Sequence, residues 1–204
     1  MADHPTVGAR VVDWDEGRWL HPPVRVERTD DGGLLVEPGA ESDLWRHTGY
    51  GFVHDDGSAL LAGFPVGTAV EVTFVLDYTA QFDQAGVLVR VDERNWVKAG
   101  VEISDGLPQV GAVVTREVSD WSVAPVPDWN GHEVTVRVSR DGDALTVRAR
   151  TAGTPWRLVR LAPLAPDAVA LAGPFCCSPS RAGLTVRFTG WRRGAADPAL
   201  HPTD

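Results

Sequence analysis

Lys98 and Glu102 are the residues whose types and spacing most directly suggest chemistry. Lys98 is the only lysine in a chain that otherwise carries its positive charge on eighteen arginines. A lysine provides a compact ammonium group whose pKa shifts readily, whereas an arginine provides a broad planar cation that stays charged. Glu102 follows four residues later and supplies a group of opposite sign, which can accept hydrogen bonds or act as a general acid or base.

Trp96 shares one side of a predicted strand with this pair. Side chains two residues apart in a strand point to the same side, so Trp96, Lys98 and Glu102 lie opposite the apolar set of residues 97, 99, 101 and 103. An indole can stack on a sugar ring while neighbouring charged residues form hydrogen bonds with the hydroxyl groups of the sugar. The pattern predicts a ligand-binding face. The alternative is an ordinary outer sheet face that is exposed to water, because such a face shows the same alternation of polar and apolar residues.

Polar residues elsewhere extend this candidate site. Gln81, Asp83 and Gln84 directly precede a predicted strand, where loop side chains can reach over the rim of a sheet towards a ligand. The same alternation places Thr115 and Arg148 on the polar side of their own predicted strands, and we expect all of these strands to contribute to one polar face. The predicted ligand-binding set is therefore Gln81, Asp83, Gln84, Trp96, Lys98, Glu102, Thr115 and Arg148.

The elements that must position these residues are short strands. Period-two alternation, interrupted by Gly, Pro and Asp-Gly, predicts strands and very little helix. Asp-Gly at 141–142 and at 105–106 predicts tight hairpins, because these residues tolerate the positive φ that such turns need. The clearest strands are 70–76, 85–91, 96–103, 110–118, 133–138, 144–150, 156–161 and 184–188. We expect one all-β domain over residues 1–204, with its core at about 12–193.

Composition excludes several classes of function. The net charge of −9 and the pI of about 5.1 disfavour nucleic acid as a partner. The apolar stretches are too short to span a membrane, and residues 1–10 lack the features of a signal peptide, so we expect a cytoplasmic protein. The adjacent residues Cys176 and Cys177 predict two reduced thiols in a strand, at most one of them in the core, and no metal site or cofactor is expected.

Four motifs in a fixed order make the chain recognisable. They are Asp-Leu-Trp-Arg at 43–46, Gln-Phe-Asp-Gln-Ala-Gly at 81–86, Asn-Trp-Val-Lys-Ala-Gly-Val-Glu at 95–102 and Ser-Asp-Trp-Ser at 119–122. Together they resemble the domain-of-unknown-function family DUF1349, over roughly residues 43–188. The resemblance implies a concanavalin A-like jelly-roll β-sandwich of two antiparallel sheets with one concave face. The chain carries Phe82 where this family often has tyrosine, which removes one hydroxyl group.

The fold that the resemblance implies houses lectins, glucanases and carbohydrate-binding modules, so the site must decide the function. The sequence lacks the closely spaced acids with which glucanases of this architecture cleave sugars. Our first hypothesis is that a small polar ligand, a saccharide, binds on the concave face. The alternative is a sugar-processing hydrolase or isomerase with Glu102 as acid or base and Asp83 as the second acid. A scaffold that pairs with itself or another protein through the sheet face is a third alternative, which keeps a homo-oligomer open.

Overall fold

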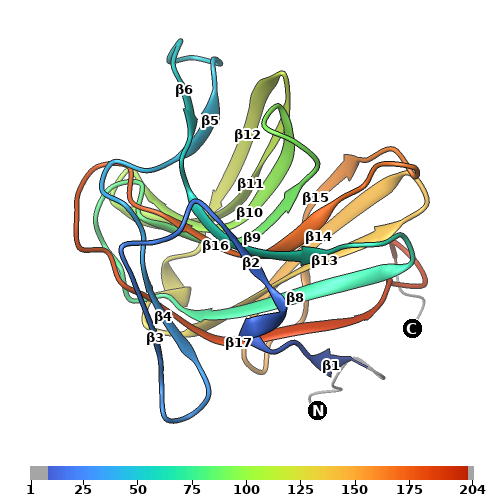
Figure 1. The fold of residues 1–204 in the computed structure, drawn as a ribbon, viewed down its shortest axis with the longest axis horizontal. Coiled ribbons are helices and arrows are strands. Elements are labelled where there is room, and N and C mark those ends of the chain that lie inside the picture. Colours follow the sequence, from blue (N-terminus) through green and yellow to red (C-terminus); the bar gives the residue numbers. More distant parts are fainter. Residues whose placement is uncertain (1–8, 202–204) are drawn as a thin grey trace.

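The polypeptide forms two large antiparallel β-sheets that pack face to face, and a short β-hairpin stands beside one of them (Figure 1). The computed structural model describes residues 9–201. Two 3₁₀ turns, Trp14–Glu16 and Pro127–Trp129, are the helical segments within this range. The structure confirms the prediction of an all-β sandwich of two antiparallel sheets.

The larger sheet has eight strands. Its order is β15 (Arg157–Pro163), β14 (Ala144–Thr151), β13 (Glu133–Asp141), β8 (Thr68–Val75), β17 (Val186–Ala195), β4 (Leu34–Glu37) and β3 (Arg25–Arg28), and β1 (Arg10–Val11) also pairs with β17. The second sheet has seven strands, in the order β12 (Val118–Pro125), β11 (Leu107–Arg116), β10 (Asn95–Ser104), β9 (Gln84–Arg90), β16 (Leu171–Cys177), β7 (Ser58–Gly63) and β2 (Arg18–Leu20). The separate hairpin joins β5 (Leu44–Arg46) to β6 (Val53–Asp55).

The main core fills the space between the two large sheets. Alternate residues of β8 and β13, such as Val72 and Val136, meet alternate residues of β9 and β10, such as Val87 and Val101. This packing uses the inward half of each alternating strand, which is what the period-two pattern predicts. All eight predicted strands are present, and the two Asp-Gly hairpins join β10 to β11 and β13 to β14.

A second apolar cluster lies on the opposite face of the seven-stranded sheet. It joins Leu44 and Trp45 of the hairpin to sheet residues that include Leu88, Trp96 and Cys177. The sheet is therefore covered on both faces beneath the hairpin. Cys176 faces the main core and Cys177 faces the second cluster, on opposite sides of the strand as alternation predicts, and because both sides are covered both free thiols are buried.

Strand β16 was missed as a full strand because of its Gly173-Pro174 pair. Proline cannot donate to a sheet ladder and usually argues against a central strand. Here β16 is central, between β9 and β7, and its pairing with β7 is interrupted at these two residues. Among residues 9–201 we find no helix with the length and apolar character that crossing a membrane demands.

Candidate functional site

A cavity of about 290 Å³ lies between the β5–β6 hairpin and the outer face of the seven-stranded sheet. In Figure 1 the hairpin stands beside the upward-curving strands β10–β12. Hairpin residues supply one wall, and β9, β10, β11 and β12 supply the floor and the other wall. The lining residues are Glu41, Asp43, Trp45, Tyr50, Phe52, His54, Phe82, Gln84, Lys98, Glu102, Val113, Trp121 and Pro179.

Lys98 and Asp43 form an ion pair at the floor of this cavity. The Lys98 Nζ atom lies 2.7 Å from Asp43 Oδ1, and the lysine is only 4% exposed. Burial is the largest single effect and would lower the pKa of Lys98, but Asp43, Cys177 and Glu102 together raise it above its ordinary value. The expectation that Lys98 sits on an exposed face is wrong, because the hairpin covers this part of the sheet.

Glu102 brings a partly unsatisfied carboxyl group to the same floor. Its Oε1 atom is buried and has no hydrogen-bond partner among the described residues. Burial raises the pKa of Glu102 to about 7, against the opposing effect of Lys98. A cavity carboxyl group with a pKa near neutrality can accept or donate a proton at physiological pH.

Gln84 lies beside Glu102 in the register of β9 and β10. Its Nε2 atom donates to Asp43 Oδ1 at 3.3 Å and to the Phe82 carbonyl oxygen at 3.1 Å. These bonds fix the orientation of the amide. The floor is thus a polar set built from two adjacent strands and the residue that precedes β5.

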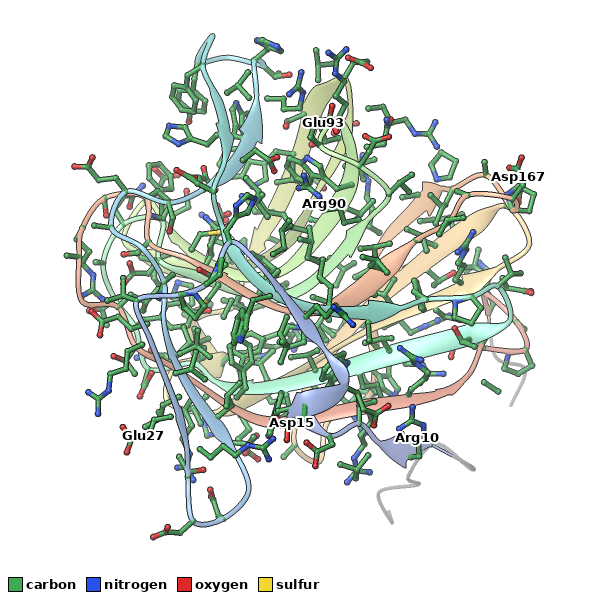
Figure 2. The ribbon with its side chains drawn as sticks, in the orientation of Figure 1. Arg10, Asp15, Glu27, Arg90, Glu93 and Asp167 are labelled. Atoms are coloured by element: carbon green, nitrogen blue, oxygen red, sulfur yellow. The ribbon has the colours of Figure 1, made fainter. Side chains whose placement is uncertain are left out.

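Aromatic rings build the walls. Trp45 contacts Trp121 of β12 edge-on with ring centroids 6.3 Å apart, and it contacts Tyr50 at 5.5 Å. Tyr50 stacks on Phe52 at 5.3 Å, and Phe52 meets His54 at 5.0 Å. Ring-bearing side chains extend from this hairpin in Figure 2. Tyr50 and Phe52 remain 56% and 44% exposed, so the ring surface that is not covered by their stacking is available to a ligand.

The hairpin that carries these rings is attached to the sheet at both of its strands. Asp55 accepts two hydrogen bonds from Arg90 of β9, at 2.6 and 2.8 Å. Figure 2 shows Arg90 on the sheet, with Glu93 in the turn beyond β9. On the other side, the Arg46 backbone N–H donates to Ser119 Oγ of β12 at 2.9 Å. The cavity wall is therefore held in place by β9 and β12.

Three glycines in one register row shape the sheet below. Gly86, Gly100 and Gly111 are direct neighbours across β9, β10 and β11. A Cβ atom on Gly86 would lie 2.0 Å from the Ala99 carbonyl oxygen, and one on Gly100 would lie 2.0 Å from that of Ala85. Such close approaches are typical of glycine kinks that curve a sheet. Because glycine has no side chain, this row also leaves the cavity-facing side of the sheet bare next to Glu102.

Three of the eight predicted site residues line the cavity: Gln84, Lys98 and Glu102. Gln81 is exposed and does not line it. Asp83 is completely buried and forms an ion pair with Arg181 and a hydrogen bond with Ser178. Asp83 therefore does not reach the cavity, and the expectation that it supplies a second acid beside Glu102 is wrong.

The other three predicted residues lie elsewhere. Trp96 is 3% exposed within the second apolar cluster, so it is not the exposed stacking platform we expected. Thr115 is buried, and its Oγ1 atom forms a hydrogen bond of 2.9 Å with Ser119 Oγ. Ser119 Oγ is the atom that accepts from the Arg46 backbone N–H of the hairpin. Arg148 belongs to β14 of the other sheet and pairs with Asp197. The prediction of one polar face shared by all these strands is wrong, because alternation assigns faces but not sheets.

Sequence reasoning missed the hairpin residues altogether. Asp43 and Trp45 enter the sequence analysis only through a family motif. Tyr50 and Phe52 lie in the loop between β5 and β6, and these strands of three residues each are too short to show alternation. The signal that could have found them is the aromatic density of residues 45–54 together with three glycines in 49–57. Such a segment is typical of a short loop or hairpin that carries a binding surface.

Comparison with known proteins identifies relatives along nearly the whole chain. The family model described as "Protein of unknown function (DUF1349)" matches residues 19–195. Regulation of enolase protein 1 from Saccharomyces cerevisiae is 37% identical over 96% of this chain and 98% of the relative. A crystal structure of a functionally unknown protein from the same yeast has a TM-score of 0.83 and 35% identity, over 90% of this chain and 98% of that one.

Solved enzymes show the same fold at much lower identity. The xylan β-1,4-xylosidase from Bacillus halodurans has a TM-score of 0.64 at 14% identity. The match covers 95% of this chain but 40% of the xylosidase. This likeness is of fold alone, and it agrees with a β-sandwich of two antiparallel sheets.

Proposed function

This chain belongs to the DUF1349 family of proteins of unknown function, and we propose that it is a binding protein whose cavity holds a small polyhydroxylated ligand, a saccharide. The observation that carries the proposal is the carboxyl group of Glu102, which lines the floor of an aromatic-walled cavity and whose Oε1 atom has no hydrogen-bond partner among the described residues. A carboxyl group that lacks hydrogen bonds is costly to bury, and a ligand hydroxyl group that bonds it in the cavity would offset part of that cost.

The chemistry of the cavity fits this class of ligand. Sugars present apolar ring faces that stack on aromatic side chains and hydroxyl groups that bond carboxylates and amides. Trp121, Tyr50 and Phe52 offer the rings, while Gln84 and Glu102 offer the polar groups. Ligand pockets measure roughly 300 to 1,000 Å³, so a cavity of about 290 Å³ suits a ligand the size of a mono- or disaccharide.

The names of similar proteins support binding in two ways. The xylosidase that shares this fold acts on a carbohydrate, which is support by analogy of fold only. The yeast relative is named for the regulation of enolase, a role that a protein can perform by binding a ligand without converting it. The proposal includes a cytoplasmic location, where buried thiols such as Cys176 and Cys177 stay reduced.

Removing one aromatic wall tests the proposal. We expect Trp121→Ala to weaken binding of the best sugar about tenfold, because a lost stacking partner costs about 1.4 kcal/mol. Isothermal titration calorimetry with a panel of neutral mono- and disaccharides first identifies that sugar. Trp156→Ala is the matched control, since Trp156 packs under Arg150 on the other sheet and lies outside the cavity.

Equal binding by the wild-type protein and the Trp121→Ala variant would place the sugar outside this cavity. A panel in which no sugar binds would reject the saccharide proposal as a whole. The Trp156→Ala variant should bind the sugar with wild-type affinity, so that a loss of affinity in Trp121→Ala can be assigned to the cavity.

A second candidate function is acid or base catalysis on a sugar. It is favoured by one observation, the pKa of Glu102 at about 7 inside a cavity. Asp43 is the other carboxylate at the floor, but its pairing with Lys98 occupies it. Release of nitrophenol from a panel of aryl glycosides, lost in a Glu102→Gln variant, would favour catalysis over binding.

A further inference from the structure

The charges that line the cavity are unevenly balanced. The basic lining residues among those described are Lys98 and His54, and the acidic ones are Glu41, Asp43 and Glu102. Lys98 is already paired with Asp43 at 2.7 Å, and His54 Nδ1 lies 3.6 Å from Asp56. Although the chain has eighteen arginines, none of the described arginines lines the cavity. A ligand therefore meets surplus negative charge.

The aromatic walls reinforce this preference. The faces of Trp, Tyr and Phe rings attract a cation and repel an anion, because their π electrons are negative at the face. Rings of Trp45, Tyr50, Phe52, Phe82 and Trp121 surround the space above the floor. Aromatic walls combined with a carboxylate are the usual components of a site for an ammonium group.

We infer that the cavity takes a sugar that carries a protonated amine, and that this ammonium group donates a hydrogen bond to the carboxyl group of Glu102. The inference rests on the proposed function and names its ligand class. A neutral hydroxyl group could fill the same place, but an ammonium group adds an attraction between opposite charges to the hydrogen bond. Sugar phosphates and uronic acids are the ligands that the same site rejects.

The titration of Glu102 agrees with this assignment. An ammonium group beside the carboxyl favours its ionised form, so binding should lower the pKa of Glu102 from about 7 and release a proton. The charged and titratable groups that act on Glu102 are Lys98 of the same strand, Asp43 before β5 and the buried Tyr78. Lys98 and Asp43 compensate each other, and Tyr78 donates its hydroxyl to the Val101 carbonyl oxygen and stays neutral.

Matched sugars test the inference. Calorimetry at about pH 7 compares glucose, glucosamine and glucuronic acid, and then the galactose and mannose series with the same substituents. In the series that fits the cavity we expect the amino sugar to bind about tenfold more tightly than the neutral sugar, and the uronic acid to bind more weakly than both. Affinity for the amino sugar should rise several-fold from about pH 5.5 to about pH 7, as Glu102 ionises.

A Glu102→Gln variant provides the internal control. The ratio of amino-sugar to neutral-sugar affinity should fall from about ten to about one, and the rise with pH should disappear. An amino sugar and a neutral sugar that bind equally to the wild-type protein, or a uronic acid that binds as tightly as the neutral sugar, would overturn the inference while the saccharide proposal stands. Preference for the amine that survives Glu102→Gln would overturn the role of Glu102. Failure of every sugar would instead reject the proposed function, and this inference with it.

Discussion

Replacing Glu102 with glutamine is expected to stabilise the protein at about pH 8 by up to about 3 kcal/mol and to change little at about pH 4. Glutamine keeps the shape of the protonated carboxyl group but cannot acquire a charge. The wild-type carboxyl group must ionise in a buried place as the pH rises, where its pKa is raised to about 7. Each tenfold change in acid strength corresponds to about 1.4 kcal/mol, which gives the size of the expected effect.

The direction follows from proton binding. Between about pH 4.5 and about pH 7 the folded protein holds a proton on Glu102 that the unfolded chain has released. The stability that this group contributes is therefore complete below about pH 4.5 and is lost as the pH rises through about 7. Urea unfolding of the wild-type protein and the variant at several pH values measures the difference.

Glu133→Gln is the matched control, because Glu133 is exposed at the start of β13 and outside the cavity. It should change stability by less than about 0.5 kcal/mol at each pH. If Glu102→Gln gave the same small change at about pH 8, the carboxyl group would be better solvated than its surroundings indicate. A protein that maintains such an unfavourable carboxylate has the pattern expected of a functional site rather than of a structural one.

Replacing Lys98 with methionine is expected to destabilise the protein by about 3 kcal/mol. Methionine preserves the apolar stem of the side chain but leaves the Asp43 carboxylate without its cation. Breaking a buried ion pair from one side costs roughly 3 to 5 kcal/mol, and the 17% exposure of the Asp43 side chain favours the lower end of that range. Equilibrium unfolding in urea at about pH 7 measures the loss.

Two further variants make this result interpretable. Arg94→Met removes the cation of an exposed pair with Glu117, whose side chains are 56% and 63% exposed, so the loss should stay below about 1 kcal/mol. Combining Lys98→Met with Asp43→Asn should recover part of the stability, because no charge is then left unpaired. A loss below about 1 kcal/mol for Lys98→Met would show that Lys98 and Asp43 behave like a surface pair.

The alternation of the sequence predicted the fold and part of the site. It placed Lys98 and Glu102 on one face of one strand correctly, because side-chain direction in a strand depends only on local geometry. What covers that face depends on contacts between distant segments. Leu44 and Trp45 are about fifty residues before Trp96 in the chain, and nothing local to β10 shows that they bury it.

For the same reason, the sequence does not predict which of the two sheets each strand joins. Arg148 has the side-chain direction that we expected, but β14 belongs to the eight-stranded sheet. Strand order is set by long-range pairing, for which a single sequence gives no direct signal. The glycines at 86, 100 and 111 were visible in the sequence, yet their alignment into one row became apparent only once the register of β9, β10 and β11 was known.

A crystal structure of the protein soaked with the tightest-binding sugar tests most directly whether the cavity is a saccharide site. The account predicts ligand density between the β5–β6 hairpin and the seven-stranded sheet, with a sugar ring against Trp121. A polar atom of the sugar should lie roughly 2.6 to 3.2 Å from an oxygen atom of the Glu102 carboxyl group, within hydrogen-bond distance. An empty cavity at a saturating sugar concentration, or density at another place on the molecule, would contradict the account.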